Sequence, residues 1–316
     1  VTPFHLYPLY RHRHDILWAN SELLLLHGHA SPFRSIAIES LLGSQEWFSK
    51  ALGINNFRIS AIGQAGLNGS GARLNWLLSL DKSENNPLLQ LIDQINLEAG
   101  LRGARFITAG ARVEDCLFEL LRRAGFCIYS WQSIWEICGY ETERAMQAAH
   151  AWRRATSADI HEIVALQRQL LAPSVQSVSE FANSHLPAFV LQGEGRLQGY
   201  ADIKKFNSVV LIKPIFKNSV AESKDFLLGL ALSLSDTTNR ILIMQTSDQA
   251  WLTKSLNEIG HQILPREELL VKHFAALEKL PLERFNHAKN GQRVDIITPL
   301  LPSKKKDKIY HFLTYK

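Results

Sequence analysis

Two pairs of histidines near the N-terminus bring together side chains of the type that bind metal ions. His12 and His14 flank an arginine, and His27 and His29 flank a glycine. Imidazole nitrogens are common zinc ligands, but a zinc site needs further ligands at a matching spacing. No cysteine or acidic residue stands at such a spacing, so we expect these histidines to lie at the surface or to pack against helices, and we assign no metal site.

The three cysteines of the chain offer thiol chemistry in principle. Cys116, Cys127 and Cys138 form no C-x-x-C motif, and their odd number argues against a disulfide framework. We therefore expect buried, reduced thiols, which favours a cytoplasmic protein. No apolar run approaches the ~20 residues of a membrane span, and the N-terminal segment lacks the basic and apolar regions of a secretory signal.

A glycine-rich segment, Gly66–Gly71, has part of the composition of a phosphate-binding loop. Such a loop continues into a helix, whereas the residues after Gly71 alternate in the manner of a strand. We therefore predict a hairpin turn here. Tyr129, Trp131 and Trp135 share one predicted strand, and aromatic side chains in strands usually belong to the core rather than to a cofactor site.

The elements that position these residues form two similar α/β units. The chain has 316 residues, of which 46% are hydrophobic and 21% charged, and this predicts a globular protein of two domains. The first unit is predicted to contain, in order, a strand at Leu6–Leu9, helices at Arg13–Leu26 and Ser31–Ser44, strands at Phe57–Gln64 and Arg73–Leu80, a helix at Pro87–Gly103, a strand at Arg105–Ala109, a helix at Glu114–Ala124 capped by Gly125, and a strand at Cys127–Ile137. The second is predicted to contain a strand at Trp152–Thr156, a helix capped by Ser157 that runs through Leu171, strands at Ala188–Gln192, Arg196–Lys204 and Val209–Ile212, a helix at Val220–Leu234, a strand at Arg240–Gln245, a helix at Asp248–Ile259 capped by Gly260, and a strand at Glu268–Phe274.

The spacing within the two units favours a duplication. Arg105 precedes Gly125 by the same distance as Arg240 precedes Gly260. A shared order with shared spacing is typical of tandem copies of one fold, and chance recurrence of helices and strands is the alternative.

The predicted domains are residues 1–145 and 150–278, joined by a short helical linker within Glu141–Ala151. Residues 279–316 form a tail that contains the basic cluster Lys304–Lys306. The formal net charge is +5, and no aromatic platform accompanies the cluster, so we expect a solvated tail rather than a nucleic-acid site.

The helix at Glu114–Ala124, which runs into Gly125-Phe126 and then a strand, resembles the end of a GNAT acyltransferase domain. Asp248–His261 resembles the same region, with Gly260-His261 in place of Gly-Phe. The resemblance covers nearly all of residues 1–278. It implies an α/β fold of two tandem GNAT-like domains, each a mixed, mainly antiparallel sheet flanked by helices.

The resemblance also implies where acetyl-CoA or another acyl-CoA would bind. GNAT domains hold the pyrophosphate at the start of their third main helix, where N–H groups, the helix dipole and spaced glycines favour an anion. In the first domain this segment is Asp81–Pro87, which lacks glycine, contains two acids and loses one N–H donor at Pro87, so we expect no CoA there. The second domain has Pro214 and Lys217 at the family's positions, and the candidate cofactor residues are Lys217, Asn218, Ser219, Val220 and Ala221. Glu222, at a glycine position of the family, opposes them.

The catalytic side of the resemblance is depleted. Many GNAT enzymes place a tyrosine four residues before the last helix's glycine, where it protonates the departing thiolate. Leu121 and Leu256 stand at those positions, and leucine donates no proton, so we assign no catalytic residue. The expected activity is acyl-CoA-dependent transfer to a small-molecule or peptide amine, or a low-activity relative of it. The alternative is a non-catalytic binding or scaffold protein that has kept the fold.

Overall fold

In a computed structural model of the chain, the described residues are 6–42, 46–55, 58–80, 87–139, 142–178, 188–193, 196–217, 223–235 and 240–274. The strands are β1 (Leu17–Trp18), β2 (Trp47–Asn55), β3 (Arg58–Asn68), β4 (Gly71–Ser79), β5 (Phe106–Ala111), β6 (Cys127–Ile137), β7 (Trp152–Arg154), β8 (Ala188–Gly193), β9 (Arg196–Phe206), β10 (Val209–Phe216), β11 (Arg240–Thr246) and β12 (Gly260–His273). The α-helices are α1 (Leu6–Arg11), α2 (Ser21–His27), α3 (Ser31–Leu42), α4 (Pro87–Leu101), α5 (Cys116–Arg123), α6 (Glu143–Ala149), α7 (Ile160–Leu170), α8 (Pro173–Gln176), α9 (Ser223–Ser235) and α10 (Thr253–Ile259). Short 3-10 helices are η2 (Arg13–Asp15), η3 (Gly28–Ala30), η4 (Ser157–Asp159) and η6 (Ser247–Leu252).

All the main strands join one continuous sheet, in the order β2-β3-β4-β5-β12-β6-β11-β10-β9-β8-β7, with β1 paired to β4 off this path. We call β2, β3, β4, β5 and β12 with helices α1–α5 the N-half, and β8, β9, β10, β11 and β6 with helices α6–α10 the C-half. In the N-half the successive pairings are antiparallel, antiparallel, parallel and antiparallel. The C-half repeats this series from β8 to β6.

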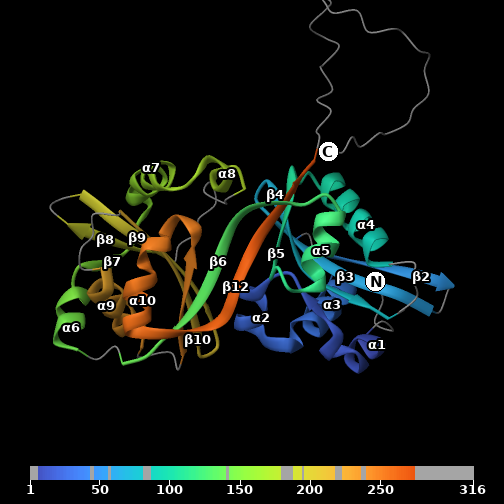
Figure 1. Cartoon of the computed structure of the whole chain (residues 1–316), viewed down its shortest axis with the longest axis horizontal. Coiled ribbons are helices and arrows are strands. Elements are labelled where there is room, and N and C mark those ends of the chain that lie inside the picture. The colour runs from blue at the N-terminus through green and yellow to red at the C-terminus, as the bar shows by residue number, and fades with distance from the viewer. Residues whose placement is uncertain are drawn as a thin grey trace, which may run out of the picture. The chain divides into compact units, whose positions relative to one another are not determined.

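The halves exchange their last strands. β6 follows the N-half helix α5 in sequence but pairs with β11, and β12 follows the C-half helix α10 but pairs with β5. β6 and β12 then pair with each other, so the seam between the halves is a hydrogen-bonded ladder (Figure 1). Residues up to His273 accordingly form one compact unit. The domain boundary between 145 and 150 stays a prediction, and the tail 279–316 lies outside the described residues.

Helices cover both faces of the C-half sheet. Buried side chains of α6, α9 and α10 pack on one face, with Leu227, Leu230 and Leu256 fully buried. On the other face α7 contributes Ile163 and Leu166, which pack against Tyr200 and Ile215. This second face is the one on which the candidate site forms. Among the described helices, none combines the length and the apolar character that a membrane span requires.

Several predicted elements are confirmed, among them β6, α4 and the turn after Asn68. The first prediction, a strand at Leu6–Leu9, is wrong: these residues begin α1, which buries Leu9 against α3 residues. The continuous helix at Arg13–Leu26 is also wrong. Its residues divide into η2, β1 and α2, because β1 pairs with β4 and Asn20 caps α2 by accepting from Leu23 N–H.

Three further expectations need correction. Strand β2 was not predicted. The helical segment that leads into α7 begins with η4, and its cap is Thr156 rather than Ser157, because Thr156 and Asp159 form a capping box. Gly125 is a left-handed cap with φ of +86°, but Gly260 is extended and begins β12. A side chain at Gly260 would overlap the carbonyl oxygen of Glu136, which explains the glycine by close strand approach.

The cysteines are the last correction. Cys116, Cys127 and Cys138 are free thiols as expected, but all three are exposed rather than buried. Cys116 is the first residue of α5, and Cys127 is the first residue of β6, where the strand faces solvent.

Candidate functional site

Each half contains one pair of parallel neighbouring strands that diverge beyond a short paired stretch. β4 and β5 pair only at Ala72–Arg73 with Ile107–Thr108. β10 and β11 pair only at Val209–Ile212 with Arg240–Ile243. We call the openings beyond these pairs the N-half split and the C-half split. Strands that diverge leave main-chain groups that must find other partners when they are buried.

The chain itself fills the N-half split. β1 pairs with β4, with Leu17 opposite Leu77 and Trp18 opposite Trp76. The following residue, Ala19, is fully buried and joins both strands: its N–H donates to the Asn75 carbonyl at 3.0 Å, and its carbonyl accepts from Gly110 N–H at 2.8 Å. Residues 17–19 therefore take the hydrogen bonds that any extended ligand would make between β4 and β5.

A side chain bridges the C-half split. Gln249, from η6, accepts from Phe216 N–H at 3.1 Å and donates to the Phe216 carbonyl at 3.3 Å. Main-chain groups alternate along a strand, so Pro214 directs its backbone to the same side as Phe216, and proline has no N–H. On this edge of β10, Pro214 therefore has no N–H to donate, and the Phe216 N–H already donates to Gln249.

A buried amide network holds Gln249 in this position. Gln245 Nε2 donates to the main-chain carbonyl of Gln249 at 3.0 Å and to Thr253 Oγ1 at 2.7 Å. The side-chain oxygen of Gln245, Oε1, accepts from Trp135 Nε1 at 3.1 Å. Gln245 and Gln249 are each 1% exposed. Fully satisfied buried networks hold their members in one arrangement, so the bridge is a fixed part of the core. Trp135 accordingly belongs to the core, as its sequence position predicted.

The predicted cofactor residues lie just beyond this bridge. Of Lys217, Asn218, Ser219, Val220 and Ala221, only Lys217 is among the described residues, and Glu222 also lies outside them. The Lys217 N–H donates to the Gln198 carbonyl at 3.0 Å, which directs it toward β9 and away from the split. The described residues do not fit an acyl-CoA arm: residues 17–19 fill one split, and Gln249 bridges the other.

The remaining predicted site residues are structural. Leu121 and Leu256 are both fully buried. The His27 ring packs on Phe206 with centroids 4.0 Å apart, and burial, followed by the charge of Arg34, lowers the pKa of His27. His29 packs on Trp18, and His12 pairs with Asp15. Among the described residues no cluster of metal-ligating side chains forms.

A cavity of about 380 Å³ lies on the second face of the sheet, and both halves line it. Its floor is formed by β9, β10 and β11 of the C-half, by the exchanged strands β6 and β12, and by β4 and β5 of the N-half. α2, α7 and α8 form its walls. The side chains that carry its chemistry are Glu22, Arg73, Tyr129, Gln167, Tyr200, Asp202, Lys204 and Lys213. The volume is within the range of small-molecule sites.

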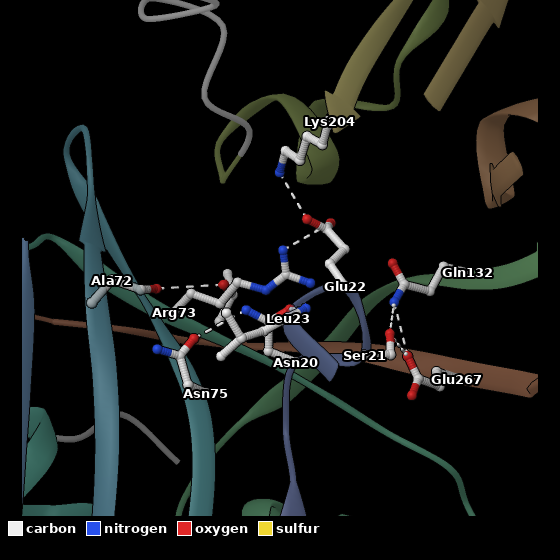
Figure 2. A network of polar contacts seen from close by, with 11 residues as sticks. Asn20, Ser21, Glu22, Leu23, Ala72, Arg73, Asn75, Gln132, Lys204 and Glu267 are labelled. Carbon is white, nitrogen blue, oxygen red and sulfur yellow. Dashed lines mark hydrogen bonds and ion pairs between the residues drawn. The ribbon is translucent and has the colours of Figure 1, made fainter. Parts of the chain in front are cut away.

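Glu22 forms the first charged cluster of the cavity (Figure 2). Its side chain is 12% exposed and accepts from Arg73 Nη1 at 2.9 Å and from Lys204 Nζ at 2.7 Å. Burial alone would raise the pKa of Glu22, but the charges of Arg73 and Lys204 and their hydrogen bonds outweigh it and lower the pKa well below its ordinary value. This cluster joins α2 and β4 of the N-half to β9 of the C-half.

We call this contact between the halves the junction. Neutral and acidic side chains add further hydrogen bonds to it. Ser21 donates to Glu267 Oε2 at 2.7 Å, and Gln132 donates to both Ser21 Oγ and Glu267 Oε2 (Figure 2). Asn20 donates to Asn75 Oδ1 at 3.0 Å. The first turn of α2 is therefore bound to β4, to both exchanged strands and to β9.

Asp202 forms the second charged site. It lies on β9, directly opposite Lys213 of β10, and two residues from Tyr200 on the same face. Burial is the main cause that raises the pKa of Asp202, and Glu22 adds to it, while Lys213 and Lys204 oppose it. Burial also raises the pKa of Tyr200, so its hydroxyl stays protonated.

Asp202→Asn should stabilise the fold at neutral pH. A folded-state pKa above the unfolded value means that the ionised carboxylate costs folding free energy above the folded pKa, and that the cost disappears as pH falls toward the unfolded pKa. Each unit of such a difference corresponds to about 1.4 kcal/mol. Urea unfolding of both proteins at about pH 7 and pH 4 would measure the gain, which should shrink at acid pH. Glu114→Gln, at an exposed carboxylate, is the control; equal effects of the two substitutions would contradict this expectation.

Sequence reasoning missed the cavity residues. The signal available for Tyr200, Asp202 and Lys204 was their alternate spacing in a predicted strand, which places all three on one face. Glu22 stands before an apolar run and carried no such signal.

No protein-family model matches the chain, and no curated protein matches its sequence. Among solved structures, a GCN5-related N-acetyltransferase from Sphaerobacter thermophilus is similar with a TM-score of 0.51 and 10% identity, over 77% of this chain and 85% of that one. A putative acetyltransferase from Pyrococcus horikoshii has a TM-score of 0.49 and 13% identity, over 86% and 87% of the two chains. A tandem GNAT protein from the clavulanic acid biosynthesis pathway has a TM-score of 0.44 and 11% identity, over 74% and 86%.

The first of these likenesses, together with the repeated strand order, shows the fold. The chain has the GNAT fold as two tandem halves, each a mixed, mainly antiparallel sheet flanked by helices. An identity this low carries no information about activity or ligand.

Proposed function

We propose that this GNAT-fold chain is a small-ligand-binding protein that does not carry out acyl-CoA chemistry, and that its ligand site is the cavity between the halves. The observation that carries the proposal is that both splits are closed by the chain's own hydrogen bonds. Ala19 joins β4 to β5 in one half, and Gln249 caps Phe216 in the other. The cavity beside them remains available to a ligand.

The energetics of the closed splits support this reading. An acyl-CoA arm in the N-half split would have to displace β1 and expose its buried partners, such as Trp76 and Leu77. In the C-half split it would have to displace Gln249 and leave a buried amide without partners. Leaving buried polar groups unpaired costs roughly 1–3 kcal/mol each, and phosphate contacts at a helix N-terminus offset little of that.

Acyl-CoA-dependent N-acyl transfer in the C-half is the second candidate. It is favoured by Asp202, whose raised pKa suits a group that takes a proton from an ammonium, and by the cavity lining, which includes Ile215 and Thr246 on the two sides of the split. Acetyl-CoA would then lie with its pyrophosphate over Asn218–Ala221 beside Lys217, and a small-molecule or peptide amine would enter the cavity.

Calorimetric titration with acetyl-CoA, combined with a free-thiol assay, tests the two candidates. We expect at most millimolar affinity and no CoA release for the wild-type chain with any amine. Gln249→Ala should strengthen binding by about tenfold or more, because it frees the Phe216 N–H. Lys217→Glu, added to Gln249→Ala, should remove this gain.

Gln262→Ala, at an exposed glutamine of β12, is the control and should change nothing. Micromolar binding of acetyl-CoA by the wild-type chain together with amine-dependent CoA release would contradict the binding-protein proposal. We further propose a cytoplasmic location, because three exposed, unpaired cysteines persist as thiols in a reducing compartment.

A further inference from the structure

Two opposite charges face each other in the cavity without meeting. Asp202 and Lys213 are directly opposite on the antiparallel pair β9 and β10, and both line the cavity. Residues in this relation normally bring their side chains together. Among the described residues, however, neither the carboxylate of Asp202 nor the ammonium of Lys213 has an ion-pair or hydrogen-bond partner.

The other charged groups of the cavity are already engaged. Glu22 holds Arg73 and Lys204 within hydrogen-bond distance, so these three charged groups already have partners. The Asp202–Lys213 pair is therefore the site where a ligand's charges find partners. A ligand that carries both a cation and an anion complements both residues, whereas a singly charged ligand leaves one of them without a partner.

A neighbouring amide gives a second, independent indication. Gln167 of α7 is 2% exposed, and its Nε2 contacts the hydroxyl of Tyr200, but its Oε1 has no partner among the described residues. Tyr200 lies beside Asp202 on the same face of β9. An unpaired buried acceptor at a cavity wall is a position for a ligand N–H group.

Part of the remaining lining is apolar, and the rest carries polar side chains such as Ser130, Gln132 and Thr246. Leu171, Val175, Leu211, Ile215 and Met244 contribute to the same cavity. They give the cavity apolar surface, which favours a hydrocarbon group over water.

We propose that the cavity binds a small zwitterion of the α-amino acid class, with its ammonium against Asp202, its carboxylate against Lys213 and an apolar side chain in the remaining space. Adjacent opposite charges on one ligand match adjacent opposite charges on neighbouring strands. This inference rests on the proposed function in taking the cavity as the binding site, and it adds the class of ligand.

Calorimetry of the full chain with L-leucine, and with the other apolar L-amino acids, is the direct test. Isocaproate lacks the ammonium of leucine, and isoamylamine lacks its carboxylate. We expect an apolar amino acid to bind and each singly charged analogue to bind at least about tenfold more weakly. Equal binding of amino acid and analogues, or no binding of any amino acid at millimolar concentration, would overturn the proposal.

Two variants assign the charges to their residues. Asp202→Asn should weaken leucine binding and leave isocaproate binding unchanged, and Lys213→Gln should weaken leucine binding and leave isoamylamine binding unchanged. Lys205→Gln, at an exposed lysine of β9 that does not line the cavity, is the matched control. A loss that falls equally on leucine and on both analogues would show a structural effect and contradict the assignment.

The outcomes also separate the two proposals. Acetylation of leucine with CoA release would refute the binding-protein function and leave the ligand class standing. Thermal stabilisation by a ligand of another class, without any response to amino acids, would refute the ligand class alone.

Discussion

Separate expression of residues 1–141 and 142–316 should yield two poorly folded fragments, whereas their co-expression should yield one 1:1 complex. The reason is the strand exchange. Without the second fragment β5 loses β12, and β6 has neither β11 nor β12 beside it. Unpaired strand edges of this length promote aggregation rather than a stable fold. Light scattering after size exclusion, together with circular dichroism, would measure assembly and folding.

Gly260→Ala in the second fragment supplies a sharp test of the seam. Its added methyl group would overlap the Glu136 carbonyl where β12 begins to pair with β6, so co-expression should no longer give the complex. Gly28→Ala in the first fragment is the comparison, because no atom lies near the added carbon, although its φ of +67° is strained for alanine. A monomeric, cooperatively unfolding 1–141 fragment would contradict the exchanged arrangement.

The sequence predicts the elements of this fold better than it predicts their partners. Apolar periodicity gave the bounds of β6 and the position of α4, because both elements bury long regular faces. The exchange was not predictable, since β6 and β12 follow equivalent helices and each carries an apolar pattern that suits pairing within either half. Only the three-dimensional arrangement distinguishes the two pairings.

The closed splits were also beyond sequence reasoning. β1 has two residues, and a strand this short has no periodicity of its own. In the sequence Gln249 is a polar residue near the start of a predicted helix, and nothing there indicates that its amide accepts from the Phe216 N–H. The missing glycines and tyrosines predict reduced acyl-CoA chemistry, and composition could not reveal the hydrogen bonds that Ala19 and Gln249 make at the two splits.

Glu22→Gln should be the most destabilising single charge removal at the junction. It leaves Arg73 facing a neutral amide inside the cavity, while Lys204, which is 54% exposed, turns to solvent. Loss of one member of a buried ion pair costs roughly 3–5 kcal/mol, and the solvation of Lys204 sets the expected loss at the low end of that range. Urea unfolding at about pH 7 would measure it.

The pH dependence of this loss identifies its cause. The pKa of Glu22 is lowered in the folded state, so its contribution to stability is fully present above the unfolded-state pKa and is lost as pH falls toward the folded value. The difference between wild type and Glu22→Gln should therefore be constant from about pH 6 to pH 8 and should narrow below about pH 4.

Glu98→Gln is the matched control, because Glu98 also accepts from two cations, Lys50 and Arg102, but does so at the surface. Its removal should cost about 1 kcal/mol or less. If the two substitutions cost the same, or if the Glu22→Gln loss persists unchanged into acid, the stability of the junction does not come from the Glu22 charge. The hydrogen bonds of Ser21, Gln132 and Glu267 would then be its source, since they bind the same turn of α2 to both exchanged strands without Glu22.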